Sequence, residues 1–515
     1  MGAFAVGGAH VVKTVVVIGG GFAGLAAGVD LAAAGVRTIV LEGKPRLGGR
    51  AYSFTDQATG EVVDNGQHAM MGCYTHTLAF LDRIGATPKL HRQPNLRVDM
   101  IHARLGAGTI ACSTLPGPLH MLSGILGYRL LQRGERWRAL LGGARLLAMH
   151  RRRDAALRSA TVEQILCRLQ QSPHARDTFW YPVAVATLNE SPARAAAAPF
   201  AEVLARAFFG SRTDSQFVLS SVGLSDLYTD DARRFIEARG GCVRTKAPVA
   251  GLAVRGDRVS GVILRDGEWI AADACISTLP PRALATLLPP VLRDGGSLRS
   301  LDTFETSPIV STHVWVDRPV LAGDFVGFVG TTTQWVYNRS RLTPGSTGQA
   351  GQYLSAVISA GREVVEWDSD RIAEQVWADM RALLPAAREA RMERAVVVKE
   401  KHATIALTPA AERQRPCATT ALRNFFLAGD WTDTGLPATI ESAVLSGHRA
   451  AALAGGKGLS KADSRSPCDK PVLSEVEGLR VSGNPRAACT SPLMLNSSQH
   501  ERTLSPRAVN GAPAR

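Results

Sequence analysis

Three glycines and one carboxylate near the N-terminus have the spacing of a dinucleotide-binding site. Gly19, Gly21 and Gly24 fit the pattern G-x-G-x-x-G, and Glu42 follows roughly 20 residues later. In such a site the first glycine permits a tight turn, the second lets a pyrophosphate approach the backbone, and the third allows close helix–strand packing. An acid at the position of Glu42 accepts hydrogen bonds from a ribose, which favours a free 2′-hydroxyl over a 2′-phosphate.

A strand, a helix and a second strand are predicted around these residues, as a dinucleotide site requires. Residues 12–18 form a β-branched run typical of a buried parallel strand, and an Ala- and Leu-rich helix is predicted from the glycines to Ala34. Phe22 and Ala23 open that helix, whose N-terminal N–H groups and positive dipole end attract phosphate. A second strand over residues 36–41 completes a βαβ unit.

A second match to the glycine pattern occurs at residues 106–111. Pro116 and Pro118 follow it, so it cannot open a helix, and we predict a turn there. The chain therefore carries one dinucleotide fingerprint, whereas an enzyme with two dinucleotide domains would carry two.

Farther along the chain, both helices and strands are predicted. We expect residues 76–225 to be mostly helical and residues 457–515, which are rich in Ser, Pro and Arg, to be a disordered tail. Strands are predicted at residues 243, 249–254, 259–264, 269–277, 307–317, 351–359 and 425–427, and helices at 370–384 and 438–454.

Two motifs at opposite ends of the chain resemble those of one flavoprotein superfamily, which includes amine oxidases and phytoene desaturases. Residues 46–50, Arg-Leu-Gly-Gly-Arg, are similar to its second signature. Residues 427–430, Leu-Ala-Gly-Asp, and residues 440–447 resemble its C-terminal flavin motif. The resemblance implies that the cofactor is FAD.

Within this superfamily the chain resembles the squalene-associated FAD-dependent group, the hydroxysqualene dehydroxylases. The segments that carry this resemblance span nearly the whole chain up to residue 454 and are 63–68 (Val-Asp-Asn-Gly-Gln-His), 72–74, 186–189 with Pro192, 334–336, 403–404 with 408–409, 429–432 and 435–441.

The resemblance implies an α/β fold, with a discontinuous Rossmann-type FAD-binding domain and an inserted α+β substrate domain, like that of amine oxidases and phytoene desaturases. The expected parts are an N-terminal extension (1–12), FAD-binding parts (13–75, 226–285 and 416–456), a mostly helical substrate- or membrane-facing region (76–225), a second substrate part (286–415) and the tail (457–515).

The same resemblance implies which residues hold FAD. Gly48 and Gly49 let the chain pass close to the cofactor, Arg50 supplies donors to its phosphate region, and Asp430 meets the ribityl hydroxyls. The full expected set is Gly19, Gly21, Phe22, Ala23, Gly24, Glu42, Gly48, Gly49, Arg50, Gly66, Gln67, Val249, Gly429, Asp430, Thr439, Ile440 and Glu441. No His, Cys and Asp cluster suggests a metal site.

The implied reaction is reductive removal of the allylic hydroxyl of hydroxysqualene, a long-chain isoprenoid, to give squalene, with reduced FAD as the hydride source. A general acid must protonate the leaving hydroxyl. We expect His68 to be this acid, with Asp64 orienting it. The alternative is that Asp64 caps the local backbone while His68 bonds a flavin carbonyl or a neighbouring amide. Asp433 and Glu441 are further candidates for the acid.

Three other functions compete with this one: oxidative desaturation of a polyisoprenoid such as phytoene, amine oxidation, and a non-catalytic flavoprotein scaffold that presents isoprenoids. Thr439 stands where amine oxidases place an aromatic residue of their substrate cage, which counts against amine substrates. An electron donor that reduces FAD is a required partner that no motif identifies.

The net charge of +14 is concentrated locally, because residues 128–158 contain nine Arg against Glu135 and Asp154. No nucleic-acid motif accompanies these arginines, so no nucleic-acid partner is expected. Residues 110–131 are uncharged up to Arg129, and an apolar segment beside a cationic one is the composition of an interfacial anchor. With no signal peptide recognised, we expect a cytoplasmic protein in peripheral contact with anionic lipids of the inner membrane face. The alternative is a solvated basic helix beside buried core.

Overall fold

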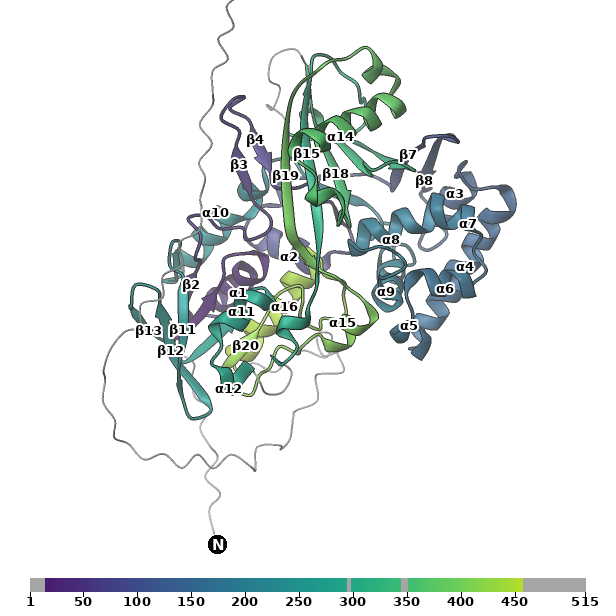
Figure 1. The fold of residues 1–515 in the computed structure, drawn as a ribbon. Coiled ribbons are helices and arrows are strands. Elements are labelled where there is room, and N and C mark those ends of the chain that lie inside the picture. The colour runs from purple at the N-terminus through teal and green to yellow at the C-terminus, as the bar shows by residue number, and fades with distance from the viewer. Residues whose placement is uncertain (1–13, 294–297, 344–350, 457–515) are drawn as a thin grey trace, which may run out of the picture. The chain divides into compact units, whose positions relative to one another are not determined.

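A five-stranded parallel sheet carries the glycine-rich turn in the computed structural model (Figure 1). Its strand order is β10-β2-β1-β14-β20, and every neighbouring pair is parallel. The strands are β1 (Thr14–Ile18), β2 (Arg37–Leu41), β10 (Cys242–Arg244), β14 (Ala274–Ser277) and β20 (Phe425–Leu427). Three distant stretches of the chain therefore meet in one sheet.

The structure describes residues 14–293, 298–343 and 351–456. The expected N-terminal extension (1–12) and tail (457–515) lie outside these residues.

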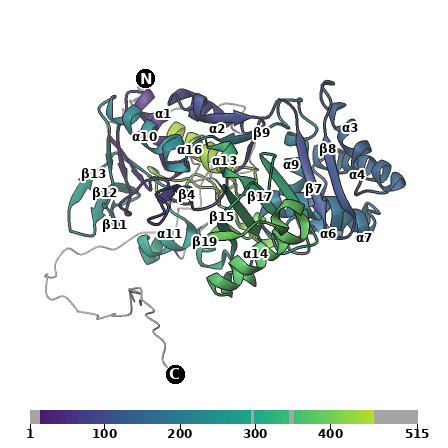
Figure 2. The same ribbon diagram turned by 90° about the horizontal axis from the view of Figure 1, so that it is seen from above.

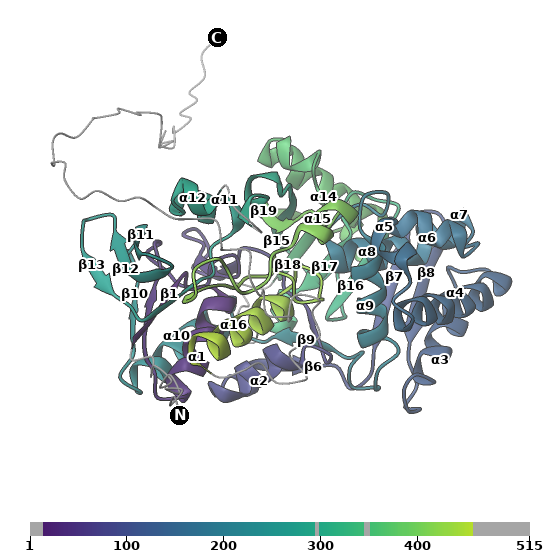
Figure 3. The same ribbon diagram turned by 90° about the horizontal axis from the view of Figure 1, so that it is seen from below.

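Both faces of the parallel sheet are buried. In β1, Val15 and Val17 belong to one apolar cluster and Val16 and Ile18 to another, which explains why the central strand is apolar at successive positions. Helices on one face pack against one another (Figure 3), and a three-stranded antiparallel sheet contacts β14 through β12. These elements are α1 (Phe22–Ala33), α10 (Leu224–Glu237), α16 (Ile440–Ala454), β11 (Val249–Arg255), β12 (Arg258–Leu264) and β13 (Trp269–Ala271).

A seven-stranded sheet is the second large sheet of the structure. Its order is β19-β15-β18-β17-β16-β7-β8, and α14 (Ser369–Leu383) packs against β15 and β19 (Figure 2). The strands are β7 (Arg97–His102), β8 (Gly106–Ala111), β15 (Thr306–Val316), β16 (Phe325–Val329), β17 (Trp335–Asn338), β18 (Gln352–Ser359) and β19 (Met392–Ile405).

Helices from the predicted helical region close the side of the site near β7 and β8 (Figure 1). They are α3 (His120–Gly127), α4 (Arg133–Arg151), α5 (Ala155–Ser159), α6 (Val162–Arg168), α7 (Pro173–Ala175), α8 (Tyr181–Leu188) and α9 (Ala197–Ala207). The remaining α-helices and β-strands are α2 (Thr75–Arg83), α11 (Pro281–Leu287), α12 (Pro290–Arg293), α13 (Arg339–Leu342), α15 (Pro409–Gln414), β3 (Ser53–Thr55), β4 (Val62–Asp64), β5 (Met70–Met71), β6 (Leu90–Arg92) and β9 (Phe217–Ser220). Among the described residues, no helix is both long enough and apolar enough to cross a bilayer.

The prediction of a turn at residues 106–111 is wrong, because these residues form β8. Gly106 has a φ of +79° and closes a hairpin that pairs β8 with β7. The segment nevertheless does not lead from a strand into a helix as a dinucleotide fingerprint does. The region 76–225 also contains the strands β6, β7 and β9 besides its helices.

Candidate active site

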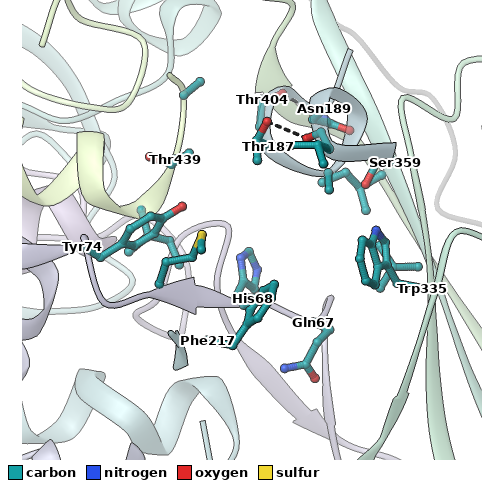
Figure 4. A pocket seen from close by; sticks show the side chains of 18 of the residues that line it. Gln67, His68, Tyr74, Thr187, Asn189, Phe217, Trp335, Ser359, Thr404 and Thr439 are labelled. Carbon is teal, nitrogen blue, oxygen red and sulfur yellow. Dashed lines mark hydrogen bonds between the residues drawn. The ribbon is translucent and has the colours of Figure 1, made fainter. Parts of the chain in front are cut away.

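A cavity of about 920 Å³ lies between the two large sheets and the helices α3, α4, α8 and α9. One end of its wall consists of the glycine-rich segments 19–23, 48–51 and 429–430, and most of the remaining wall is apolar. Figure 4 shows His68 and Tyr74 across the cavity from Asn189 and Ser359. The cavity therefore connects the predicted dinucleotide site to an apolar chamber.

Glu42 ties the first glycine turn to the end of β2. Its carboxylate accepts hydrogen bonds from Gly20 N (2.8 Å) and Lys44 N (2.9 Å), which fixes the side chain on the cavity wall. Gly19 has a φ of +109°, a conformation that only glycine adopts without strain. The carboxylate oxygens keep further lone pairs, so Glu42 can still accept from ribose hydroxyls.

The two later glycines of the motif have different physical roles. A Cβ atom on Gly21 would meet nothing closer than Gly49 Cα at 3.8 Å, so the position opens onto free space at the start of α1. No side chain caps this helix, and its first N–H groups are left for an anion. A Cβ on Gly24 would lie 1.9 Å from the carbonyl oxygen of Gly19. Gly21 thus leaves room for a pyrophosphate, whereas Gly24 serves packing and does not line the cavity.

Arg50 joins the second signature to the C-terminal motif. Its guanidinium donates to both carboxylate oxygens of Asp430, at 3.1 and 2.5 Å, and to Ala403 O at 2.9 Å. Burial opposes its charge, yet the nearby Asp430 carboxylate raises the pKa of Arg50 above its ordinary value. Asp430 and Ala403 of β19 therefore take three of the donor contacts of Arg50, and its expected contact with the phosphate region stays a prediction.

The N-terminus of α16 points its first turn at the cavity, as Thr439 and Ile440 line the wall. Glu441 differs from the prediction, because its carboxylate accepts from His76 N, Thr77 N and Thr77 Oγ1 at the start of α2. This carboxylate therefore fixes α16 to α2 and does not line the cavity.

Val249 also lies off the cavity wall, because it pairs with Leu264 in the β11–β12 ladder. Apart from Gly24, Val249 and Glu441, every residue expected to hold FAD lines the one cavity.

His68 lies on the cavity wall, whereas Asp64 does not. Burial lowers the pKa of His68 below its ordinary value of 6.5; the charge of Asp64 opposes this shift and that of Arg50 adds to it. Asp64 accepts from Leu224 N at 2.9 Å, at the start of α10, and makes no hydrogen bond to His68. Asp64 therefore holds the distant start of α10 rather than the local backbone, and among the described residues no hydrogen bond supports its predicted role of orienting His68.

Asp433, another candidate for the acid, accepts from Gly435 N at 3.1 Å within a turn and does not line the cavity. The cavity wall also carries ionisable residues outside the predicted site set, among them Tyr74 and Glu400. Burial raises the pKa of the Tyr74 phenol above its ordinary value. Tyr74 belongs to the segment 72–74 that carries the family resemblance, whereas no spacing pattern marks Glu400, which only the fold places on the wall.

A buried ion pair supports the segment that carries His68. Arg339 Nη2 lies 3.2 Å from Asp64 Oδ2, and both side chains are almost fully buried. Arg339 Nη1 also donates to Gln67 Oε1 at 3.0 Å. Beside this pair, burial and the charge of Arg339 lower the pKa of His313 to about 3, and the neutral ring hydrogen-bonds the Tyr353 hydroxyl at 2.7 Å. Arg339 thus fixes the residues on either side of Asn65 and Gly66.

Comparison with known proteins agrees with this geometry. The flavin containing amine oxidoreductase family matches residues 22–454. Hydroxysqualene dehydroxylase of Rhodopseudomonas palustris is 30% identical over 463 residues, which are 86% of this chain and 98% of that protein. The 15-cis-phytoene desaturase of Synechococcus elongatus is 24% identical over 447 residues, covering 84% of this chain and 94% of that protein.

An oxidoreductase structure from Methanosarcina mazei superposes with a TM-score of 0.67 at 17% identity, covering 85% of this chain and 99% of that chain. The predicted fold class, family and FAD cofactor are confirmed. The chain belongs to the flavin containing amine oxidoreductase family, together with the hydroxysqualene dehydroxylases that it resembles, and is an FAD-dependent oxidoreductase.

Proposed function

We propose that the protein reductively removes the allylic hydroxyl of hydroxysqualene and releases squalene. The observation that carries this proposal is the single cavity that joins the FAD-binding segments to a large apolar chamber. A long hydrocarbon with one polar group matches such a chamber, because apolar surface is favourably removed from water there. The relatedness to hydroxysqualene dehydroxylases supports the same substrate class.

The chemistry balances with a hydride and one proton. The C–O bond breaks, the hydroxyl leaves as water after taking the proton, and a new C–H bond forms at the same carbon. When bound, reduced FAD supplies the hydride and both electrons. The protein's own tasks are to hold the carbon in place, to exclude water and to deliver the proton.

Aromatic rings in the chamber suit the positive charge that develops as the hydroxyl leaves. Phe217 and Trp335 line the wall, and both pack against Phe325, with ring centroids 5.0 and 6.2 Å apart. The negative face of an aromatic ring stabilises a nearby cation without offering a nucleophile that would trap it. We assign these rings to stabilisation of the allylic cation.

His68 remains our candidate for the proton donor, and its lowered pKa predicts the direction in which the reaction rate changes with pH. Because the pKa lies below 6.5, most of the imidazole is neutral at neutral pH, and the protonated fraction grows as pH falls. Single-turnover reduction of hydroxysqualene should therefore accelerate between about pH 8 and pH 6. The His68→Gln variant should keep its FAD, react about 10²-fold more slowly and lose this pH dependence.

Glu400→Gln is the matched control, because Glu400 is another ionisable wall residue close to Arg50 and the change removes its carboxylate. A His68→Gln variant with the wild-type rate and pH profile would remove His68 from the proton-transfer step. Loss of the pH dependence in Glu400→Gln instead would transfer that role to Glu400.

We also propose that the cavity opens toward a membrane surface at α3 and α4. Leu119, Leu122, Trp137 and Leu141 line the cavity and are nevertheless 49, 38, 60 and 57% exposed. The same stretch of chain carries exposed arginines, on α4 and just before and after it: Arg129, Arg133, Arg138, Arg145, Arg151, Arg152 and Arg153. Apolar side chains beside cationic ones suit the boundary between acyl chains and anionic headgroups. A bilayer-dissolved substrate would then reach the chamber without crossing water.

Flotation with liposomes tests this membrane contact. We expect binding that rises with anionic lipid, weakens with salt and falls when Arg151, Arg152 and Arg153 are changed to Glu, since each arginine contributes roughly 1 kcal/mol. Trp137→Asp should also weaken binding. The matched control is Trp269→Asp, because Trp269 is 56% exposed on β13 and does not line the cavity. Recovery in the soluble fraction at every lipid charge would contradict the proposal.

The dehydroxylation itself is tested by anaerobic mixing of flavin-reduced protein with hydroxysqualene. We expect the oxidised flavin absorbance to return in a single phase that depends on substrate. Phytoene added to oxidised protein is the second arm, because the phytoene desaturases are also relatives. Flavin reduction by phytoene, with no reaction of hydroxysqualene, would replace dehydroxylation by desaturation.

A further inference from the structure

A small polar group interrupts the apolar wall of the chamber. Thr404 of β19 and Ser359 of β18 both line the cavity, and these strands flank β15. Asn189, at the C-terminal end of α8, hydrogen-bonds Thr404 at the same place (Figure 4). Asn189 and Thr404 therefore meet in a hydrogen bond, and Ser359 adds a third polar side chain to the same largely apolar wall.

Two backbone groups and one side chain take the amide hydrogen bonds of Asn189. Its Nδ2 donates to Ser307 O and to Thr404 Oγ1, both at 3.0 Å, and its Oδ1 accepts from Ala360 N at 2.7 Å. A backbone carbonyl on one side and a backbone N–H on the other exclude the flipped amide. Asn189 is also 6% exposed and left-handed, with a φ of 50°, so its position is fixed by the end of α8.

This arrangement decides the direction of the Thr404 hydroxyl. Because Asn189 Nδ2 can only donate, Thr404 Oγ1 must accept, and its own proton is left to donate elsewhere. Thr187 provides a contrast on the same wall, since its hydroxyl already donates to Val183 O at 2.8 Å within α8. Thr404 thus offers a donor to the cavity that Thr187 does not offer.

The position of Thr404 relative to the cofactor-binding segments is also fixed. The preceding residue, Ala403, accepts from Arg50 Nη1 at 2.9 Å, and Arg50 pairs with Asp430. Ser359 is held by Gln334, which bonds both its N–H (2.9 Å) and its carbonyl (3.0 Å). The polar group therefore lies beside the FAD-binding end of the chamber on a rigid sheet.

We propose that Thr404, oriented by Asn189 and assisted by Ser359, is the subsite that takes the hydroxyl oxygen of an otherwise hydrocarbon substrate. The inference rests on the proposed function and adds how the alcohol is distinguished from the hydrocarbon product. A polar site left unpaired by a ligand that lacks its hydroxyl disfavours that ligand. A threonine hydroxyl is too weak an acid to give up its proton, so Thr404 binds the alcohol while another group protonates it.

The test is a comparison of equilibrium binding to oxidised holoenzyme, which needs no turnover. Hydroxysqualene and squalene in detergent micelles are titrated against the flavin absorbance. We expect wild-type protein to bind hydroxysqualene about tenfold more tightly than squalene. Thr404→Val should lose this preference by weakening hydroxysqualene alone, with full FAD content, whereas Thr404→Ser should retain it.

Two further variants keep the test decisive if Thr404→Val folds poorly. Ser359→Ala should reduce the preference for the alcohol by a smaller factor, and Thr187→Val should leave that preference unchanged. Wild-type protein without any preference, or a flavin-loaded Thr404→Val that keeps it, would overturn the subsite. Failure of reduced wild-type protein to convert hydroxysqualene would instead overturn the proposed function, whatever the binding preference.

Discussion

Gly21→Val is expected to abolish stoichiometric FAD binding while the polypeptide still folds. Gly21 has extended backbone, with φ −87° and ψ −172°, which any residue adopts, and an added Cβ would meet no protein atom within 3.7 Å. The side chain would instead occupy the space beside the start of α1 where a pyrophosphate must lie. We expect the FAD affinity to fall by at least about 10²-fold.

The measurement is the flavin-to-protein ratio after purification and after incubation with FAD, together with the far-ultraviolet circular dichroism spectrum. Gly24→Val is the matched comparison, because its Cβ would clash with Gly19 O at 1.9 Å and should lower the stability of the fold itself. A folded Gly21→Val protein that retains stoichiometric FAD would show that the pyrophosphate site has been misassigned.

Arg339→Met is expected to cause a large loss of stability. Arg339 and Asp64 are both almost fully buried, so removing the guanidinium leaves the Asp64 carboxylate without its counter-charge. Breaking one partner of a buried ion pair costs about 3–5 kcal/mol. The melting midpoint of the holoenzyme should fall accordingly, and Gln67 should lose the contact that fixes it.

A double variant separates the ion pair from simple packing. Adding Asp64→Asn to Arg339→Met removes the unpaired charge, so part of the lost stability should return. Arg97→Met is the surface control, because Arg97 and Asp99 form an exposed pair worth less than about 1 kcal/mol. Equal melting midpoints for wild type and Arg339→Met would contradict a structural role for this pair.

Local patterns predicted the elements around the glycine-rich turn. The first strand, the glycine turn and α1 lie within one stretch whose periodicity and glycines have direct physical causes, so β1, α1 and β2 occur within a few residues of the predictions. The elements of the C-terminal motif also agree with the predictions, since β20 spans Phe425–Leu427 and α16 spans Ile440–Ala454. Gly429, between them, has a φ of +130°, which glycine adopts without strain.

The apolar end of the cavity could not be predicted in the same way, because it depends on strand register and on distant pairing. β19 was missed since charged residues interrupt its apolar pattern, although it is the long partner of β15 that places Thr404. Arg339 contacts Gln67 across 272 residues of sequence, and no local pattern connects the two. Asp64 forms its ion pair with this same arginine and not with His68.

The most direct test of the central claim is the product of one turnover. Purified holoenzyme is reduced under anaerobic conditions and mixed with excess hydroxysqualene, and the isoprenoids are then quantified by mass spectrometry. Dehydroxylation predicts squalene equimolar with the flavin that is reoxidised, and no squalene from protein whose flavin was left oxidised. Hydroxysqualene recovered unchanged from fully reduced holoenzyme would contradict the account.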